Sequence, residues 1–245
     1  NNTLPIPPLL DSTVAPDGLR LFTFSVEEGK KSFMPGYITP TLGYSGSYLG
    51  PTIKVRDGER VRFKVVNNLK QVTTVHWHGL HVPAQWDGGP RQVIKAGETW
   101  HPDFKIKQPA ATLWYHPHAM GLTGEHAYMG LAGLFVIEDE KSDSLTIPKE
   151  YGVDDIPVVL QDRRFYDDGS FAYVQSMMDV MHGVIGNYML VNGALWPNKE
   201  VPKGLMRKQS FCSVWPSSSC QSIREKRLIC HNFVQTWIAT SHIIK

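Results

Sequence analysis

Hydrophobic and polar residues alternate along several short segments of the chain, as they do in β-strands that bury one face. Residues 52–56 and residues 60–65 both show this alternation, and Asp57-Gly58 lies between them. Because Asp-Gly favours a two-residue turn, the pattern predicts a β-hairpin. Further strands are predicted at residues 99–106, 113–115 and 133–137. Helical periodicity is scarce by comparison, so the first half of the chain is expected to consist of strands.

The second half repeats this pattern after a polar interruption. Residues 138–155 are polar and charged, which predicts a linker, and a strand series resumes at residues 156–160. A hairpin is expected around Asp167-Asp168-Gly169. Residues 177–190 are rich in Met and leave a short helix and a long loop as alternatives. Met177, Met178 and Met181 offer a cluster of soft metal ligands as one interpretation, but we expect them to fill gaps in packing.

The alternation stops near residue 205, and this change sets the last predicted boundary. Many short strands with Gly and Pro turns predict an all-β chain, either a β-sandwich or a Greek-key barrel. The predicted organisation is a first domain at 1–140, a linker at 141–155, a partial second domain at 156–204 and an unrelated tail at 205–245. We expect this tail to be disordered or the product of a frameshift.

Composition and charge exclude several classes of protein. Hydrophobic residues make up 42% of the chain, which favours a globular core, and the net charge of +2 favours neither nucleic acid nor a membrane surface as partner. No apolar run reaches the length of a membrane span. All three cysteines lie in the tail, at Cys212, Cys220 and Cys230, so we expect neither a disulfide nor a thiolate ligand in the first 204 residues. The chain begins with Asn1 rather than Met, as a processed, exported protein would.

Two His-x-His units lie 40 residues apart, at His76-Trp77-His78 and His116-Pro117-His118. Because strand side chains alternate between faces, each unit presents both of its imidazoles on one face. Imidazole binds copper, zinc, iron and nickel, so two such units predict a metal site formed by four histidines. The remaining histidines lack this spacing and are expected to be structural or exposed: His81, His101, His126, His182, His231 and His242.

The residues around these units carry a resemblance to a known family. The principal segments are His76-Trp77-His78-Gly79-Leu80, Trp86-Asp87-Gly88-Gly89-Pro90, Gln108-Pro109-Ala110-Ala111-Thr112, Trp114-Tyr115-His116-Pro117-His118 and Met129-Gly130-Leu131-Ala132-Gly133-Leu134. Together they resemble the multicopper oxidases, and among these the bacterial periplasmic copper-efflux (cuprous) oxidases and laccases. The resemblance runs from about Thr3 to Gly204.

This resemblance implies cupredoxin-like Greek-key β-sandwich domains, one complete and a second one partial, and it implies copper as the metal. In the family, a trinuclear copper cluster lies between the first and last domains. By resemblance, His76 is a ligand of the type 2 copper, and His78 and His116 are ligands of one type 3 copper. His118 is then a ligand of the other type 3 copper.

Asp87 matches an acidic residue that assists proton delivery to reduced oxygen in the family. Reduction of dioxygen to water consumes protons, and a carboxylate beside a metal site can relay them. The simpler interpretation is that Asp87 belongs to an ordinary Asp-Gly-Gly turn. Only the resemblance favours the proton role.

The implied activity is oxidation of Cu(I) or phenolic donors coupled to reduction of dioxygen, with a role in copper tolerance and a periplasmic location. Copper ions, dioxygen and the electron donor are the expected partners, and no obligate protein partner is evident.

The chain departs from the family in its tail, where Ile229 precedes Cys230-His231 and no Met follows Met206, so we expect no type 1 copper site. We therefore expect half of the trinuclear site, and little or no activity for the isolated chain. The alternative is a catalytically inactive copper-binding fragment. An independent electron carrier is disfavoured because the predicted domains contain no Cys.

Overall fold

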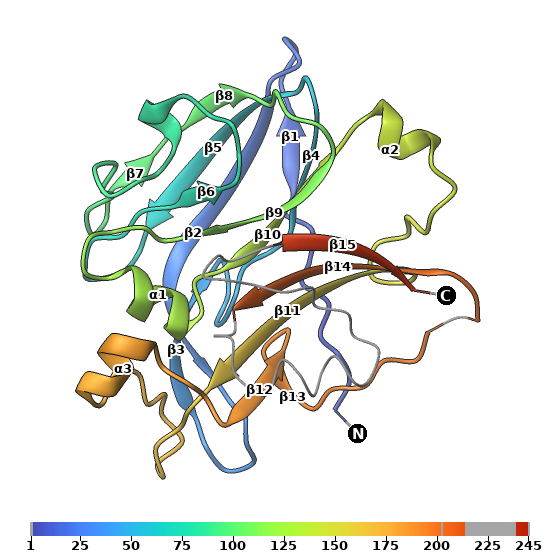
Figure 1. The fold of residues 1–245 in the computed structure, drawn as a ribbon. Coiled ribbons are helices and arrows are strands. Elements are labelled where there is room, and N and C mark those ends of the chain that lie inside the picture. The colour runs from blue at the N-terminus through green and yellow to red at the C-terminus, as the bar shows by residue number, and fades with distance from the viewer. Residues whose placement is uncertain (1, 202, 214–238, 245) are drawn as a thin grey trace.

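The computed structural model describes residues 2–201, 203–213 and 239–244. It consists largely of strands arranged in three sheets (Figure 1). Two of these sheets face each other around a common core, and the third lies beside them. The predicted all-β architecture is therefore confirmed for the described residues.

The first sheet has six strands and forms one face of the sandwich. Its order is β1-β2-β5-β7, with β3 also paired to β2 and β8 also paired to β5. Strand β2 pairs parallel with β5 and antiparallel with β1 and β3. The strands are β1 (Ser12–Val14), β2 (Arg20–Lys31), β3 (Thr39–Tyr44), β5 (Arg60–Asn67), β7 (Thr99–Trp100) and β8 (Asp103–Lys105).

The second sheet has four strands in the order β4-β10-β9-β6, which leaves β6 at an edge. Its strands are β4 (Ile53–Arg56), β6 (His76–His78), β9 (Ala111–His116) and β10 (Gly133–Glu138). The core between the two sheets is aromatic: the rings of Phe63 in β5 and Trp77 in β6 lie 4.6 Å apart between centroids. This packing holds β6 against the core of the sandwich, because the Trp77 side chain is almost fully buried there.

The predicted hairpin at residues 52–65 is wrong, although both of its strands exist. Strand β4 pairs with β10, whereas β5 pairs with β2, so the turn at Asp57-Gly58 passes from one sheet to the other. Ile53 and Phe63 both face the shared core, each from its own sheet. Alternation therefore identified the buried face of each strand correctly, but it contains no information about which strand lies alongside.

Other predicted strands are confirmed with local changes. Residues 113–115 and 133–137 lie within β9 and β10. Residues 99–106 form two short strands rather than one, because the chain breaks at Pro102, which has no N–H to donate to a ladder. The hairpin around Asp167-Asp168-Gly169 is confirmed by the antiparallel bridge between Phe165 and Phe171.

The third sheet contains the later part of the chain, in the order β13-β12-β11-β14-β15. Strand β14 pairs parallel with β11 and antiparallel with β15. The expected disorder of residues 205–245 therefore does not extend to β14 or β15, while residues 214–238, with Cys220, Cys230 and His231, lie outside the described residues. The strands are β11 (Asp155–Arg163), β12 (Tyr188–Val191), β13 (Ala194–Leu195), β14 (Met206–Ser213) and β15 (Ala239–Ile244). The domain boundaries and the frameshift stay predictions.

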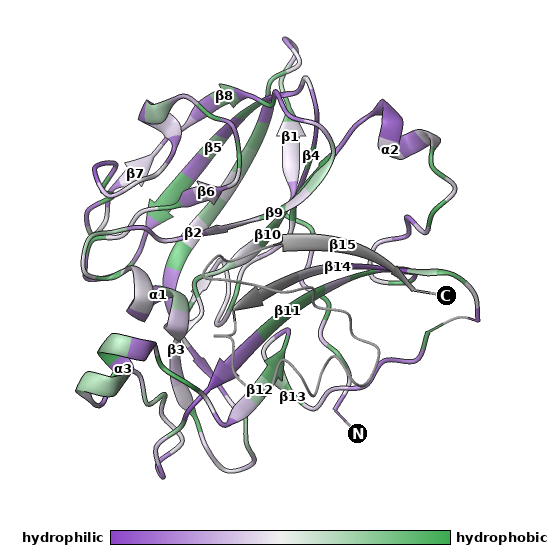
Figure 2. Cartoon of the chain, viewed as in Figure 1, coloured by the Kyte–Doolittle hydropathy of each residue, from purple (hydrophilic) through white to green (hydrophobic). Residues whose placement is uncertain are grey.

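The helices are short and lie outside the sheets. They are η1 (Ala84–Trp86), α1 (Thr123–Met129), α2 (Glu140–Ser144) and α3 (Met177–His182). Figure 2 shows that α2, within the predicted linker, is hydrophilic, whereas β5 and β11 carry hydrophobic positions. Helix α3 settles the alternatives for residues 177–182, but its Met side chains are 61–70% exposed, so the expectation that they fill gaps in packing is wrong. None of the helices in the part of the chain that the structure describes has the length and apolar character needed to cross a membrane.

Candidate metal centre

The first His-x-His unit forms the edge strand β6 of the second sheet, whereas the second begins at His116, the last residue of the neighbouring β9, and His118 lies just beyond that strand. Strands β6 and β9 pair antiparallel, and their register places His76 directly opposite His116. Since residues opposite each other in a ladder point to the same face, the imidazoles of both strands emerge on one side. The buried Trp77 points to the other side, into the core. Strand alternation thus brings together histidines that are 40 residues apart in the sequence.

Three of the four predicted histidines converge closely enough to share metal ions. One ring nitrogen from each of His76, His78 and His116 lies within 4.8 Å of the others. The ring of His118 borders this group, with its centroid 5.3 Å from that of His76 and 6.1 Å from that of His116. His118 therefore lies next to the three converging histidines but is not one of the residues whose ring nitrogens meet within 4.8 Å.

Backbone carbonyls fix the tautomers of two rings. The Nδ1 of His76 lies 2.8 Å from the carbonyl oxygen of Asp87, and the Nδ1 of His116 lies 2.7 Å from that of Pro117. Because a carbonyl oxygen only accepts hydrogen bonds, each Nδ1 carries the proton and each Nε2 keeps its lone pair. The Nε2 of His116 lies 3.1 Å from the Nδ1 of His78, so it faces the space that the rings share. Carbonyl partners of this kind orient metal-ligating histidines.

Burial favours the neutral, metal-binding form of two of the clustered rings, His78 and His116. Desolvation, together with the neighbouring histidines and against the opposing hydrogen bond to the Pro117 carbonyl, lowers the pKa of His116 to about 3. The pKa of His78 is also lowered, mainly by burial and then by His76 and His118. A neutral imidazole offers a lone pair to a cation, whereas an imidazolium does not. His78 and His116 therefore each have a lone pair to offer near neutral pH.

His118 supplies an independent test of whether these residues fit a metal. Its Nδ1 is buried and has no hydrogen-bond partner among the described residues. A buried polar atom without a partner is costly, and a ligand at that atom would remove the cost. The backbone N–H of His118 donates to Thr74 Oγ1 at 2.6 Å, which fixes the position of the backbone that carries the imidazole. The donor set therefore fits a borderline or soft divalent metal such as copper.

Asp87 lies beside the cluster. Its Oδ1 is 3.4 Å from His76 Nδ1, and its side chain is 39% exposed. Its carbonyl oxygen, rather than its carboxylate, makes the shorter contact with His76. The structure thus gives Asp87 an orienting contact that the sequence did not predict.

Trp114 and Thr74 also contribute to the cluster and were missed. The Trp114 ring stacks on His116 at 3.9 Å and on His78 at 5.0 Å between centroids. Trp114 lies two residues before His116, so strand alternation could have placed it on the histidine face. Thr74 could not have been found this way, because its contact with residue 118 spans 44 positions of sequence.

The other histidines lie away from this group where they are described. His126 is fully buried in α1, and its ring nitrogens contact Gln71 Nε2 at 2.9 Å and Thr73 Oγ1 at 3.4 Å. His81, His101 and His182 are exposed. The prediction that they are structural or exposed is confirmed for these four, while His231 and the side chain of His242 lie outside the described residues.

Comparisons with known proteins agree with this geometry. A family model described as multicopper oxidase matches residues 25–142. Multicopper oxidase mco of Staphylococcus aureus is 40% identical over 206 residues, which cover 84% of this chain and 45% of that protein. Cell division protein FtsP of Escherichia coli K12 is 41% identical over 204 residues, covering 83% of this chain and 42% of that protein.

A solved structure extends the likeness to the fold. The laccase-like multi-copper oxidase CueO from Ochrobactrum sp. has a TM-score of 0.78 at 43% identity, covering 84% of this chain and 46% of that one. The predicted cupredoxin-like class is thereby confirmed. The chain spans less than half the length of each of these three relatives.

Proposed function

Because the chain belongs to the multicopper oxidase family, we propose that His76, His78, His116 and His118 hold copper ions of an oxygen-reducing centre. The observation that carries the proposal is the convergence of three imidazoles, each with a ring nitrogen within 4.8 Å of the others. His76 would bind the type 2 copper, His78 and His116 one type 3 copper, and His118 the other. Further ligands of the trinuclear cluster would come from outside residues 1–245.

The protein's own groups prepare this centre for proton-coupled chemistry. Copper bound here would pass electrons to dioxygen. The carbonyl oxygens of Asp87 and Pro117 accept from the Nδ1 atoms of His76 and His116, which leaves the Nε2 atom of each ring available to a metal. The Asp87 carboxylate lies 3.4 Å from His76 Nδ1 and is partly exposed, so it can take protons from solvent and hold them beside the cluster. We assign Asp87 this proton-relay role as part of the proposal.

For the whole protein we propose oxidation of Cu(I) or phenolic donors with dioxygen as acceptor, a role in copper tolerance, and a periplasmic location. The relatives named as a multicopper oxidase and as a laccase-like CueO support this class of reaction. The 245-residue chain by itself is proposed to bind copper with little or no turnover, because four ligands supply only part of a trinuclear cluster and no route for electron entry.

Copper titration of the folded, metal-free chain tests the proposal. Wild-type protein is expected to take up copper and to give an electron paramagnetic resonance spectrum typical of Cu(II) with nitrogen ligands. Replacement of all four histidines by Ala is expected to abolish copper uptake. The exposed His101 and His182, replaced by Ala, serve as matched controls that should retain full uptake. Uptake that is absent, or that survives the fourfold replacement, would overturn the proposal. Oxygen consumption measured on the same samples should stay near background, and robust turnover would contradict the proposed inactivity of this chain.

Two other functions are separated by the same measurements. Copper uptake without oxygen consumption, even when the rest of a family relative is supplied in trans, would favour a catalytically inactive copper-binding chain. The 41% identity to the cell division protein FtsP favours a role in cell division as the second candidate. A chain that folds, as judged by circular dichroism, but takes up no copper would support that second role.

A further inference from the structure

The turn that follows His78 is held by one side chain from another part of the chain. The N–H of Leu80 donates to the carbonyl of Trp77 at 3.1 Å, and Gly79 has a φ of +83°. This combination is typical of a type II turn with His78 at its first central position. Gln108 bridges the turn, because its Nε2 donates to the Gly79 carbonyl at 2.9 Å and its Oε1 accepts from the His81 N–H at 2.9 Å.

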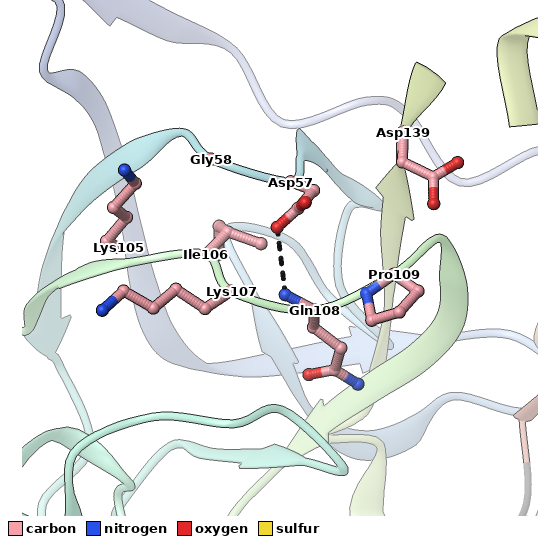
Figure 3. Close-up of a pocket in the computed structure, with 8 residues that line it drawn as sticks. All are labelled: Asp57, Gly58, Lys105, Ile106, Lys107, Gln108, Pro109 and Asp139. Carbon is pink, nitrogen blue, oxygen red and sulfur yellow. Dashed lines mark hydrogen bonds between the residues drawn. The ribbon is translucent and has the colours of Figure 1, made fainter. Parts of the chain in front are cut away.

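Gln108 is itself fixed at its backbone. Its N–H donates to Asp57 Oδ1 at 3.1 Å, and two residues later the Ala110 N–H donates to Asp139 Oδ2 at 2.9 Å. Figure 3 shows the bond from Asp57, with the side-chain amide of Gln108 directed away from it. The segment held in this way leads directly into β9, the strand that carries His116. Gln108 therefore connects the approach to one histidine strand with the exit from the other.

Strand β6 needs such support because it is only three residues long. A strand this short at the edge of a sheet has few ladder hydrogen bonds and opens easily. Thr74 anchors the end before His76 through its bond to His118. Gln108 is the corresponding anchor beyond His78, so the two side chains hold β6 at both ends.

We infer that Gln108 is a positioning residue for the copper site, which sets the place of His78 relative to His116. This inference rests on the proposed function. A ligand held in place before the metal arrives loses less conformational freedom on binding, so the clamp raises metal affinity without touching the metal. Leu at this position keeps the approximate size of the side chain and removes both hydrogen bonds. Glu keeps the acceptor for His81 N–H and removes the donor to Gly79.

Two measurements on Gln108→Leu test the inference. Copper affinity, measured by competition with a chelator, is expected to fall roughly tenfold, within the range found when groups that orient metal ligands are replaced. In metal-free protein, hydrogen exchange at Leu80 and His81 is expected to accelerate. Gln108→Glu should also lower the affinity, because it sets a carboxylate oxygen against the Gly79 carbonyl oxygen. Gln175→Leu makes the same change at an exposed glutamine before α3 and should alter neither quantity.

The outcomes distinguish this inference from the proposed function. Faster exchange with unchanged copper affinity would show that Gln108 holds the turn but not the ligand, and would overturn the inference. Unchanged exchange would overturn it as well. Wild-type protein that takes up no copper would remove the proposed function instead. The nitrogen-15 chemical shifts of the His78 ring in metal-free protein would then test whether Gln108 positions this ring. A positioning role requires these shifts to change in Gln108→Leu and to stay constant in Gln175→Leu, and unchanged shifts in Gln108→Leu would overturn the inference.

Discussion

His126 differs from the cluster histidines in having ordinary polar partners on both ring nitrogens. Gln71 and Thr73 contact the ring, and the side chain is fully buried in α1. Burial lowers the pKa of His126 to about 4, whereas the pKa of an unfolded histidine is about 6.5. The folded protein thus keeps this ring neutral over a range of pH in which the unfolded chain would protonate it.

This difference predicts a loss of stability in mild acid. Above a pH of about 6.5 the ring is neutral in both states, and its full contribution to stability is present. As the pH falls toward 4, the unfolded chain binds a proton that the folded chain excludes, so the free energy of unfolding decreases. Between pH 7 and pH 4.5, metal-free wild type is expected to lose about 2 kcal/mol more than His126→Gln, measured by urea denaturation. His101→Gln, at an exposed position, should behave as wild type. Equal losses for wild type and His126→Gln would contradict this account.

The sequence predicted the cluster residues better than the groups that support them. The repeated His-x-His spacing, which is a local pattern, identified His76, His78, His116 and His118, although His118 lies just beyond the end of β9. Thr74 and Gln108 act across 44 and 29 residues of sequence, respectively, and no local pattern reports such contacts. The carbonyl contact of Asp87 was equally hidden, because every residue has a carbonyl and only the folded chain shows where it points.

At the scale of elements, the loop after η1 packs directly against the start of β6. Gly88 has a φ of +71°, and a Cβ added to it would lie 1.7 Å from the carbonyl oxygen of Val75. Gly97 has a similar φ of +76°, but a Cβ there would meet nothing within 4 Å. The two glycines therefore share the same backbone conformation and differ in the space around them.

We expect Gly88→Ala to be much more damaging than Gly97→Ala. The second change carries only the cost of a left-handed conformation, about 1 kcal/mol. The first also forces the loop away from Val75, which adds about 1–3 kcal/mol and moves the Asp87 carbonyl that orients His76. Urea denaturation should show the difference in stability, and copper affinity should fall in Gly88→Ala alone. Comparable effects of both changes would mean that this close approach is unimportant.

Strand positions were predictable only in part, because β2, β3 and β14 were missed, and strand partners were not predictable. Periodicity reports which face of a segment is buried, and it found Ile53 and Phe63 correctly. Parallel pairs such as β4 with β10 join segments about 80 residues apart, and only the shared core selects them. Helix α3 has no buried side chain to predict it. Ser176 caps the helix in a capping box with Asp179, and Arg164 pairs with the Asp179 carboxylate, so polar contacts rather than an apolar stripe hold the helix in place.

At the scale of the whole molecule, the second sheet of the sandwich is covered by the third sheet. Trp114 and Leu134, on β9 and β10, form a buried cluster with Val159 of β11. Thr112 Oγ1 donates to Gln209 Oε1 at 3.0 Å in the same interface. The strand that carries His116 is thus packed from both sides: its Tyr115 contacts the sandwich core, and its Trp114 contacts the third sheet.

This shared packing predicts that the described sheets unfold together. Val159→Ala removes buried methyl groups from the third sheet and is expected to cost about 2 kcal/mol. If the sheets form one cooperative unit, slow amide exchange should accelerate by the same factor, about thirtyfold, in β5 and β9 as in β11. Val14→Ala, at an exposed position of β1, should leave exchange unchanged. Acceleration confined to β11 would instead mean that the third sheet opens alone. The histidine strands would then keep their geometry without it, because their order would depend only on the aromatic core around Trp77.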